Sequence, residues 1–142
     1  MKSIRQVLQG KTNNLITVAP NDTVFDALQK LADKDIGALL VMDGDRLAGI
    51  FSERDYARKV TLAGKSSKDV TVSAIMTEKV FYVTPDQTVS QCLALMTDKH
   101  FRHLPVMENN KVLGVVSIGD LVKQKIAEQS FIIDQLERYI TS

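Results

Sequence analysis

The chain has 142 residues, and 44% of them are hydrophobic, so it can bury a sizeable core without disulfides or metals. Its 18 Lys and Arg residues balance 17 Asp and Glu residues, and the net charge of +1 lacks the basic excess typical of proteins that bind nucleic acids or anionic membranes. No apolar run is long enough for a transmembrane helix or a signal peptide, and the single cysteine, Cys92, cannot form an internal disulfide. We therefore expect a cytoplasmic protein with small-molecule or protein partners, and neither nucleic-acid nor membrane binding.

The chain contains an internal repeat. When the sequence is shifted by 65 residues against itself, identical residues coincide from Val18 to Tyr56 without a gap. The coinciding pairs include Val18/Val83, Pro20/Pro85, Thr23/Thr88, Leu28/Leu93, Leu39/Leu104, Gly49/Gly114, Ser52/Ser117 and Asp55/Asp120. Unrelated amphipathic segments would not keep one register across helix, strand and turn patterns. The sequence therefore predicts two copies of one unit, with repeat 1 over residues 1–66 and repeat 2 over residues 67–142.

The predicted elements begin with a short N-terminal segment that has apolar residues at helical spacing. Each repeat then has a short strand that ends before a proline, a helix, two strands joined by a hairpin, and a second helix. In repeat 1 the strands cover residues 15–18, 38–42 and 47–51, and the helices start after Thr23 and Ser52. In repeat 2 the strands cover residues 80–83, 104–107 and 112–116, and the helices start after Thr88 and Ser117. Thr23 with Asp26, and Thr88 with Gln91, have the spacing of a capping box.

The segments outside the repeated elements are a polar linker over residues 64–69, a short helix near residues 72–76, and a long C-terminal helix. The C-terminal helix is predicted to run from Ser117 through Ile140, with apolar residues at near-helical spacing. This stripe packs either on the core of its own chain or on a second chain, because a stripe does not identify its partner. The predicted fold class is α+β, with two pseudo-symmetric β-α-β-β-α repeats packed through their sheets and helices at both ends.

The motif that carries chemistry is Gly-x-x-Ser-x-x-Asp, which occurs in both repeats at residues 49–55 and 114–120. A serine followed three residues later by an acid is typical of a helix N-cap, so capping alone would account for Ser52, Asp55, Ser117 and Asp120. The same geometry also suits a ligand, because free amides and a hydroxyl at a helix start can face a phosphate. An ionised aspartate one turn into the helix can accept two hydrogen bonds from a ribose diol.

A second group lies on the neighbouring strand of repeat 2. Arg102 and His103 are predicted at the mouth of this strand, next to the start of the Ser117 helix. The planar fork of an arginine suits a phosphate, whereas an exposed Arg-His pair is also common on a solvated surface. Repeat 1 has Gly37 and Ala38 at the same position, so the two halves are chemically unequal.

Taken together, these motifs resemble a pair of CBS domains, named for cystathionine β-synthase, and most of all the stand-alone bacterial CBS-pair proteins. The resemblance rests on the tandem unit, the Arg-His-Leu-Pro-Val strand at residues 102–106, and the two Gly-x-x-Ser-x-x-Asp segments. It implies a Bateman module, which binds adenosine nucleotides in clefts between the repeats and is regulatory rather than catalytic.

The resemblance also implies roles for individual residues. Asp55 and Asp120 would hold ribose hydroxyls, and Ser52 and Ser117 would meet phosphate, where the family usually has threonine. The residues expected to surround the adenine are Thr17, Tyr82, Ala38 and Pro105. The phosphate contacts are expected from Arg102 and His103 with Arg54 as a helper, and Ile118 completes the set of expected binding residues.

The sequence thus predicts a sensor that binds AMP, ADP, ATP or an NAD-type ligand, with no catalytic cofactor, no metal site and no catalytic residues. A homodimer and an unidentified protein target are the expected partners. Two alternatives are a ligand-free dimerisation adaptor and a nucleotide-handling enzyme. The enzyme is disfavoured because we find no nucleophile with an oriented base, no metal cluster and no Walker-type loop. The adaptor is disfavoured because both repeats keep their serine and aspartate.

Overall fold

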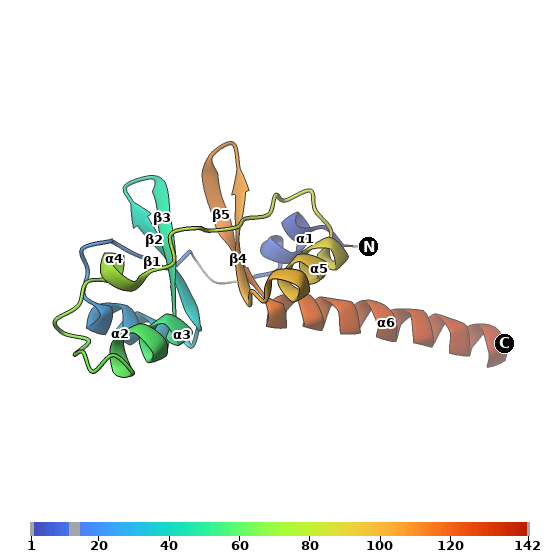
Figure 1. Ribbon diagram of the computed structural model, residues 1–142. Coiled ribbons are helices and arrows are strands. Elements are labelled where there is room, and N and C mark those ends of the chain that lie inside the picture. The colour runs from blue at the N-terminus through green and yellow to red at the C-terminus, as the bar shows by residue number, and fades with distance from the viewer. Residues whose placement is uncertain (1, 12–14, 142) are drawn as a thin grey trace. The chain divides into compact units, whose positions relative to one another are not determined.

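Each copy of the repeat builds a unit of its own in the computed structural model, which describes residues 2–11 and 15–141 (Figure 1). The repeat-1 unit contains residues 14–81. The repeat-2 unit contains residues 82–142 together with the N-terminal residues 1–13. The units therefore differ from the predicted bounds: residues 1–13, predicted in repeat 1, pack with repeat 2, and residues 67–81, predicted in repeat 2, pack with repeat 1.

The repeat-1 unit has a three-stranded sheet in the order β1-β2-β3, in which β1 is parallel and β3 antiparallel to β2. Its elements are β1 (Thr17–Val18), α2 (Val24–Lys34), β2 (Ala38–Asp43), β3 (Arg46–Ser52), α3 (Glu53–Tyr56), the π-helical η1 (Ala57–Thr61) and α4 (Val72–Ile75). The alternate residues Leu39, Val41 and Phe51 of the hairpin are buried together with the apolar face of α2. This core is separate from that of the other unit.

The repeat-2 unit has a two-stranded antiparallel sheet, β4-β5. Its elements are α1 (Ile4–Gln9), α5 (Val89–Lys99), β4 (His103–Glu108), β5 (Lys111–Ser117) and α6 (Ile118–Thr141). Its core includes Ile4 from α1 and Cys92 from α5, which confirms that Cys92 is a core residue. The hairpins of the two units also share an irregularity, since the strand register shifts after Val41 in β2 and after Val106 in β4.

The short helices α1 and α4 dock in the same way on the two units. Ser3, the N-cap of α1, forms a β-bridge with Thr88, the N-cap of α5. In the repeat-1 unit, Thr71 at the N-cap of α4 forms the corresponding bridge with Thr23 at the N-cap of α2. Each unit is thus completed by a short helix that was predicted to belong to the other repeat.

The strand predicted over residues 80–83 is wrong in extent, because its described β-sheet pairing is a single parallel bridge between Val83 and Val106. Val83 donates its amide to the carbonyl of Pro105 across 3.0 Å and accepts a hydrogen bond from Met107 across 2.9 Å. Pro105 has no amide hydrogen to extend the ladder toward residue 81, whereas Leu40 at the same position in repeat 1 pairs with Thr17. The proline therefore reduces the strand to one bridge.

The other predicted elements are present. The α+β fold class is confirmed, as is the capping of α2 by Thr23 and of α5 by Thr88, although only Thr88 forms the full capping box. The long C-terminal helix is confirmed as α6, which extends away from the rest of its unit (Figure 1). Among the described residues, no helix is both long and apolar enough to cross a membrane.

Candidate functional site

The Ser-x-x-Asp motif of repeat 1 lies where β3 ends and α3 begins. Ser52 is the N-cap of α3, and its Oγ accepts a hydrogen bond from the amide of Asp55 across 3.2 Å. Oδ2 of Asp55 in turn accepts hydrogen bonds from the amide and the hydroxyl of Ser52, at 3.0 and 3.1 Å. The motif therefore forms a reciprocal capping box, as the N-cap interpretation predicts.

The second carboxylate oxygen of Asp55 is also in use. Oδ1 accepts a hydrogen bond from the Thr77 hydroxyl across 3.3 Å and forms an ion pair with Lys59 Nζ across 3.1 Å. The Asp55 side chain is only 12% exposed. Both oxygens are thus engaged in a nearly buried position, and a ribose diol would have to displace one of these donors.

The motif of repeat 2 is arranged differently, at the junction of β5 and α6. The amide of Asp120 donates to the Ser117 hydroxyl across 3.1 Å, and the Ser117 amide donates to Oδ2 of Asp120 across 2.9 Å. The same Oδ2 accepts a hydrogen bond from Lys11 Nζ across 2.8 Å. The Asp120 side chain is 27% exposed, so solvent reaches this carboxylate more easily than that of Asp55.

The charges around Asp120 shift two pKa values. Burial alone would raise the pKa of Asp120, but the hydrogen bonds from Lys11 and from the Ser117 amide outweigh burial and lower it, so the carboxylate stays ionised. Burial lowers the pKa of His103, with the positive charges of Lys11 and Arg102 acting in the same direction. His103 is therefore a neutral imidazole near pH 7, able to donate one hydrogen bond and accept another.

The structure brings several of the predicted residues of repeat 2 together. His103 pairs with Ser117 across the β4-β5 hairpin, and the amide of Ile118 donates to the carbonyl of Arg102 across 2.8 Å. Arg102 and Ile118 are exposed, and His103 is half-buried. The other two predicted residues lie near the bridge between Val83 and Val106. Pro105 is buried in β4, and Tyr82 is exposed and directly precedes Val83.

In the repeat-1 unit, Ala38 is the residue that pairs with Ser52, at the start of β2. This pairing places the predicted small residue beside the start of α3, where Ala38 is buried. Arg54 is exposed on α3, and Thr17 is half-buried in β1, where it pairs with Leu40 rather than with the motif. Ala38, Ser52 and Asp55 therefore form one local group, and Thr17 lies farther along the sheet.

Sequence analysis missed Lys11 and Thr77, which bind the aspartates from segments that follow α1 and α4, and Lys59, which forms the ion pair with Asp55. Thr77 follows α4, and its backbone exchanges two hydrogen bonds with Ile50 of β3, at 2.9 and 3.0 Å. Lys11 follows α1 and donates a second hydrogen bond to the carbonyl of Val115, which is the counterpart of Ile50 in β5. No local sequence pattern identifies either residue, because each contact depends on how the helix before it docks.

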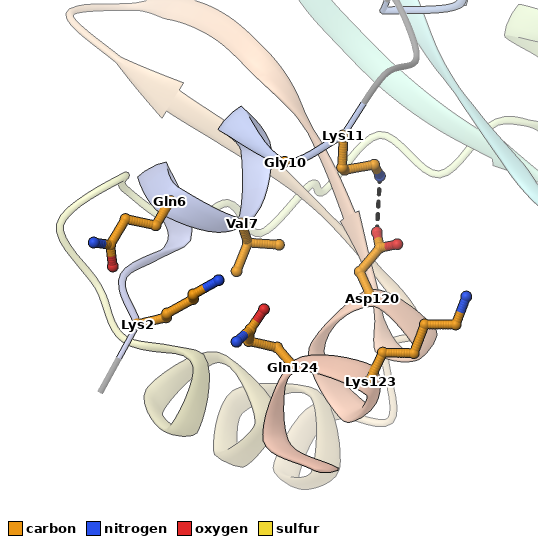
Figure 2. A pocket seen from close by; sticks show the side chains of 8 residues that line it. All are labelled: Lys2, Gln6, Val7, Gly10, Lys11, Asp120, Lys123 and Gln124. Atoms are coloured by element: carbon orange, nitrogen blue, oxygen red, sulfur yellow. Dashed lines mark hydrogen bonds and ion pairs between the residues drawn. The ribbon is translucent and has the colours of Figure 1, made fainter. Parts of the chain in front are cut away.

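A hollow of about 200 Å³ opens beside Asp120, between α1 and the start of α6 (Figure 2). Three lysines and one aspartate supply its charged groups, and the aspartate is already paired with one of the lysines. The surroundings therefore favour an anionic ligand group. The lining residues are Lys2, Gln6, Val7, Gly10, Lys11, Asp120, Lys123 and Gln124.

Within the described part of the chain, no group of three or more His, Cys, Asp or Glu side chains could hold a metal ion. Burial raises the pKa of the Cys92 thiol to about 11, so this cysteine is protonated at neutral pH and is a poor nucleophile. The arrangement can bind charged and hydroxylated groups through Asp120, Ser117, Lys11 and His103.

Comparison with known proteins agrees with this architecture. The CBS domain family model matches residues 4–61 and 72–126 of the chain. A putative signal-transduction protein with CBS domains from Burkholderia ambifaria MC40-6 has a similar structure, with a TM-score of 0.87 and 52% identity. That match covers 90% of this chain and 96% of the other.

Curated proteins are also similar in sequence. The mitochondrial CBS domain-containing protein CBSX3 of Arabidopsis thaliana is 42% identical over 125 residues, or 84% of this chain. The chain spans 61% of that relative's length. The CBS domain-containing protein YhcV of Bacillus subtilis is 27% identical, and the match covers 92% of this chain and 90% of YhcV.

Proposed function

Because this chain belongs to the CBS-domain family, we propose that it is a regulatory module that binds an adenosine nucleotide beside Asp120. A regulatory role is supported by the similar Burkholderia protein, which is described as a putative signal-transduction protein. The proposed ligand is AMP, ADP, ATP or an NAD-type dinucleotide.

The observation that carries the proposal is the state of the Asp120 carboxylate. It is ionised, partly exposed and fixed at the start of α6 by Ser117, so it can accept hydrogen bonds from a ribose diol. A hydrogen bond to a charged group contributes about 1.5–3 kcal/mol. One diol with a buried adenine and a phosphate contact could thus reach the roughly −8 kcal/mol of a micromolar ligand.

We assign the positive groups around Asp120 to the phosphates of the ligand. Arg102 and Lys11 both act electrostatically on His103, so the three side chains share one neighbourhood. When the diol binds, Lys11 loses its hydrogen bond with Asp120 and its ammonium becomes available to a phosphate. The ligand would therefore exchange one ion pair for another.

The site in the repeat-1 unit is proposed to bind more weakly. Asp55 holds Ser52, Thr77 and Lys59 at once, and its side chain is less than half as exposed as that of Asp120. A diol gains little binding free energy when it only replaces donors that already satisfy a buried carboxylate. Repeat 2 is consequently the half in which the first nucleotide binds.

Isothermal titration calorimetry with AMP, ADP, ATP, NAD and S-adenosylmethionine tests the proposal. The AMP titration is repeated with 2′,3′-dideoxy-AMP, which lacks both ribose hydroxyls. We expect micromolar binding of at least one adenosine nucleotide and a loss of more than tenfold without the two hydroxyls. Absence of binding by all five compounds would favour the ligand-free adaptor. Conversion of the nucleotide into products during incubation would favour the enzyme.

A further inference from the structure

The hollow between α1 and α6 suits one end of a ligand rather than a whole nucleotide (Figure 2). Its volume of about 200 Å³ is below the roughly 300–1,000 Å³ of pockets that enclose a drug-sized molecule. Among the described residues that line it, Val7 is the one apolar side chain, and none is aromatic. An adenine base would gain little apolar contact there, so the occupant is a polar, charged group.

The charged side chains of the hollow leave an excess of positive charge. Lys2, Lys11 and Lys123 supply three positive charges, and Asp120 supplies one negative charge. Lys11 is paired with Asp120 across 2.8 Å, whereas neither Lys2 nor Lys123 has an ion-pair partner within the described part of the chain. Figure 2 shows Lys2 at one end of the hollow and Lys123 beside Asp120 at the other, with Gln124 between them. Unpaired lysines therefore lie at both ends.

The repeat-1 unit provides an internal comparison for Lys2, because its short helix docks through the same backbone hydrogen bonds. The carbonyl of Lys2 accepts a hydrogen bond from the amide of Val89 across 3.2 Å, and the carbonyl of Val70 accepts one from the amide of Val24 across 2.9 Å. Lys2 and Val70 are thus equivalent positions. Val70 is partly buried and packs against the core of its unit, whereas Lys2 is exposed. The repeated fold therefore does not require a lysine at position 2.

The α6 side of the hollow differs from repeat 1 as well. Gln124 occupies the position of Lys59 when the repeats are aligned. Lys59 Nζ donates to the carbonyl of Ile75 across 2.9 Å and pairs with Asp55 across 3.1 Å. In repeat 2 the ion pair with the aspartate comes instead from Lys11, and Gln124 lines the hollow. The arrangement of the hollow is therefore particular to repeat 2.

We propose that the α1–α6 hollow binds a chain of phosphate groups, with Lys2 and Lys123 as direct contacts. A lysine ammonium binds phosphate as a point charge, so two separated lysines suit an extended chain of phosphates. On a nucleotide with its ribose at Asp120, the hollow would hold the β and γ phosphates. The chain would then distinguish ATP from AMP. This assignment of the β and γ phosphates rests on the proposed function, whereas the phosphate site itself does not.

The first test compares ATP with AMP by isothermal titration calorimetry on the full chain. We expect the wild type to bind ATP about tenfold more tightly than AMP, because only ATP reaches the two lysines. Lys2→Gln and Lys123→Gln should each weaken ATP binding about threefold, as is typical of exposed ion pairs, and leave AMP binding within about twofold.

The matched control is Lys111→Gln, which removes the same charge. Lys111 is exposed at the start of β5 and does not line the hollow, so this variant should change neither affinity by more than about twofold. Equal affinities of the wild type for ATP and AMP would overturn the assignment of the β and γ phosphates to the hollow. Equal weakening of ATP and AMP by Lys2→Gln would overturn it as well.

Glu128 provides a test with the opposite sign. Its Oε1 accepts a hydrogen bond from the amide of Lys2 across 3.1 Å, so a negative charge lies beside the Lys2 end of the hollow. Glu128→Gln keeps an acceptor for this amide and removes the charge, so ATP binding should strengthen by about threefold. Unchanged or weaker ATP binding in this variant would contradict an anionic occupant at the Lys2 end.

Inorganic tripolyphosphate separates the phosphate site from the proposed function, because it has neither ribose nor base. Titration of the ¹⁵N-labelled chain should give saturable changes in the amide signals of Lys2 and Gln124, with weaker binding in Lys2→Gln than in Lys111→Gln. Such changes without binding of any nucleotide would support the phosphate site and reject the nucleotide site. Absence of saturable changes, or an equal loss of binding in Lys111→Gln, would overturn the phosphate site even if AMP binds beside Asp120.

Discussion

Lys11 donates a hydrogen bond to Asp120 across 2.8 Å, although the two residues are 109 positions apart in the chain. Thr77 binds Asp55 in a comparable way in the other unit, across 3.3 Å. In both cases a residue just after a docked helix donates a hydrogen bond to the carboxylate of the Ser-x-x-Asp motif. The availability of each aspartate therefore depends on a segment that lies outside the repeated elements.

The first prediction concerns the pKa of His103 in a Lys11→Ala variant. Lys11 lowers the pKa of His103 through its positive charge and also pairs with Asp120, whose negative charge raises it. Removing the lysine eliminates the first effect and leaves the second uncompensated, so the pKa of His103 should rise. A pH titration of the His103 ring signals by NMR measures the change, and His100 serves as the internal reference. A decrease would contradict the described neighbourhood of His103.

A second prediction compares the glycines that begin the two motifs. A Cβ at Gly49 would lie 2.8 Å from the carbonyl oxygen of Thr77, which is backbone and is held by Ile50. A Cβ at Gly114 would lie 3.0 Å from the flexible end of the Leu8 side chain, which can move. Gly49→Ala should therefore destabilise the protein by about 1–3 kcal/mol, and Gly114→Ala by less.

Urea unfolding of the two glycine variants provides this comparison, with circular dichroism as the readout. Equal losses, or a larger loss for Gly114→Ala, would show that the close approach of the Thr77 backbone does not constrain position 49.

The third prediction concerns stability in acid. The pKa of Asp120 is lowered in the folded state, so its ionised form stabilises the fold above its ordinary pKa of about 4, and this contribution is lost as pH falls through the lowered value. The wild type should thus be more stable than Asp120→Asn at pH 7, and the difference should shrink toward pH 3. A difference in unfolding free energy that stays constant over this range would contradict the ionised Lys11–Asp120 pair.

Local patterns explain why so much of the fold could be predicted. The repeat, the capping threonines and the long C-terminal helix depend on residues a few positions apart, and each of them is present in the structure. The prediction of a strand over residues 80–83 was wrong because Pro105 lacks the amide hydrogen that would pair with this strand. Pro105 lies on a different strand that is distant in sequence. Hydrophobic periodicity carries no information on such a missing donor.

The candidate site was predictable only in part, for a similar reason. Ser117 and Asp120 are three residues apart and form the capping geometry that their spacing predicts. The contacts of Lys11 and Thr77 arise from the docking of α1 and α4, which a single sequence does not reveal. Asp55 and Asp120 differ both in these contacts and in exposure, at 12% and 27%, and the proposed difference between the two halves rests on both.

The most direct test of the nucleotide-binding proposal is a calorimetric titration of Asp120→Ala and Asp55→Ala with the adenosine nucleotide that the wild type binds most tightly. The account predicts that Asp120→Ala weakens binding more than tenfold, whereas Asp55→Ala, with its carboxylate already engaged by Thr77 and Lys59, has a smaller effect. An unchanged affinity in Asp120→Ala would contradict the assignment of this carboxylate to the ribose.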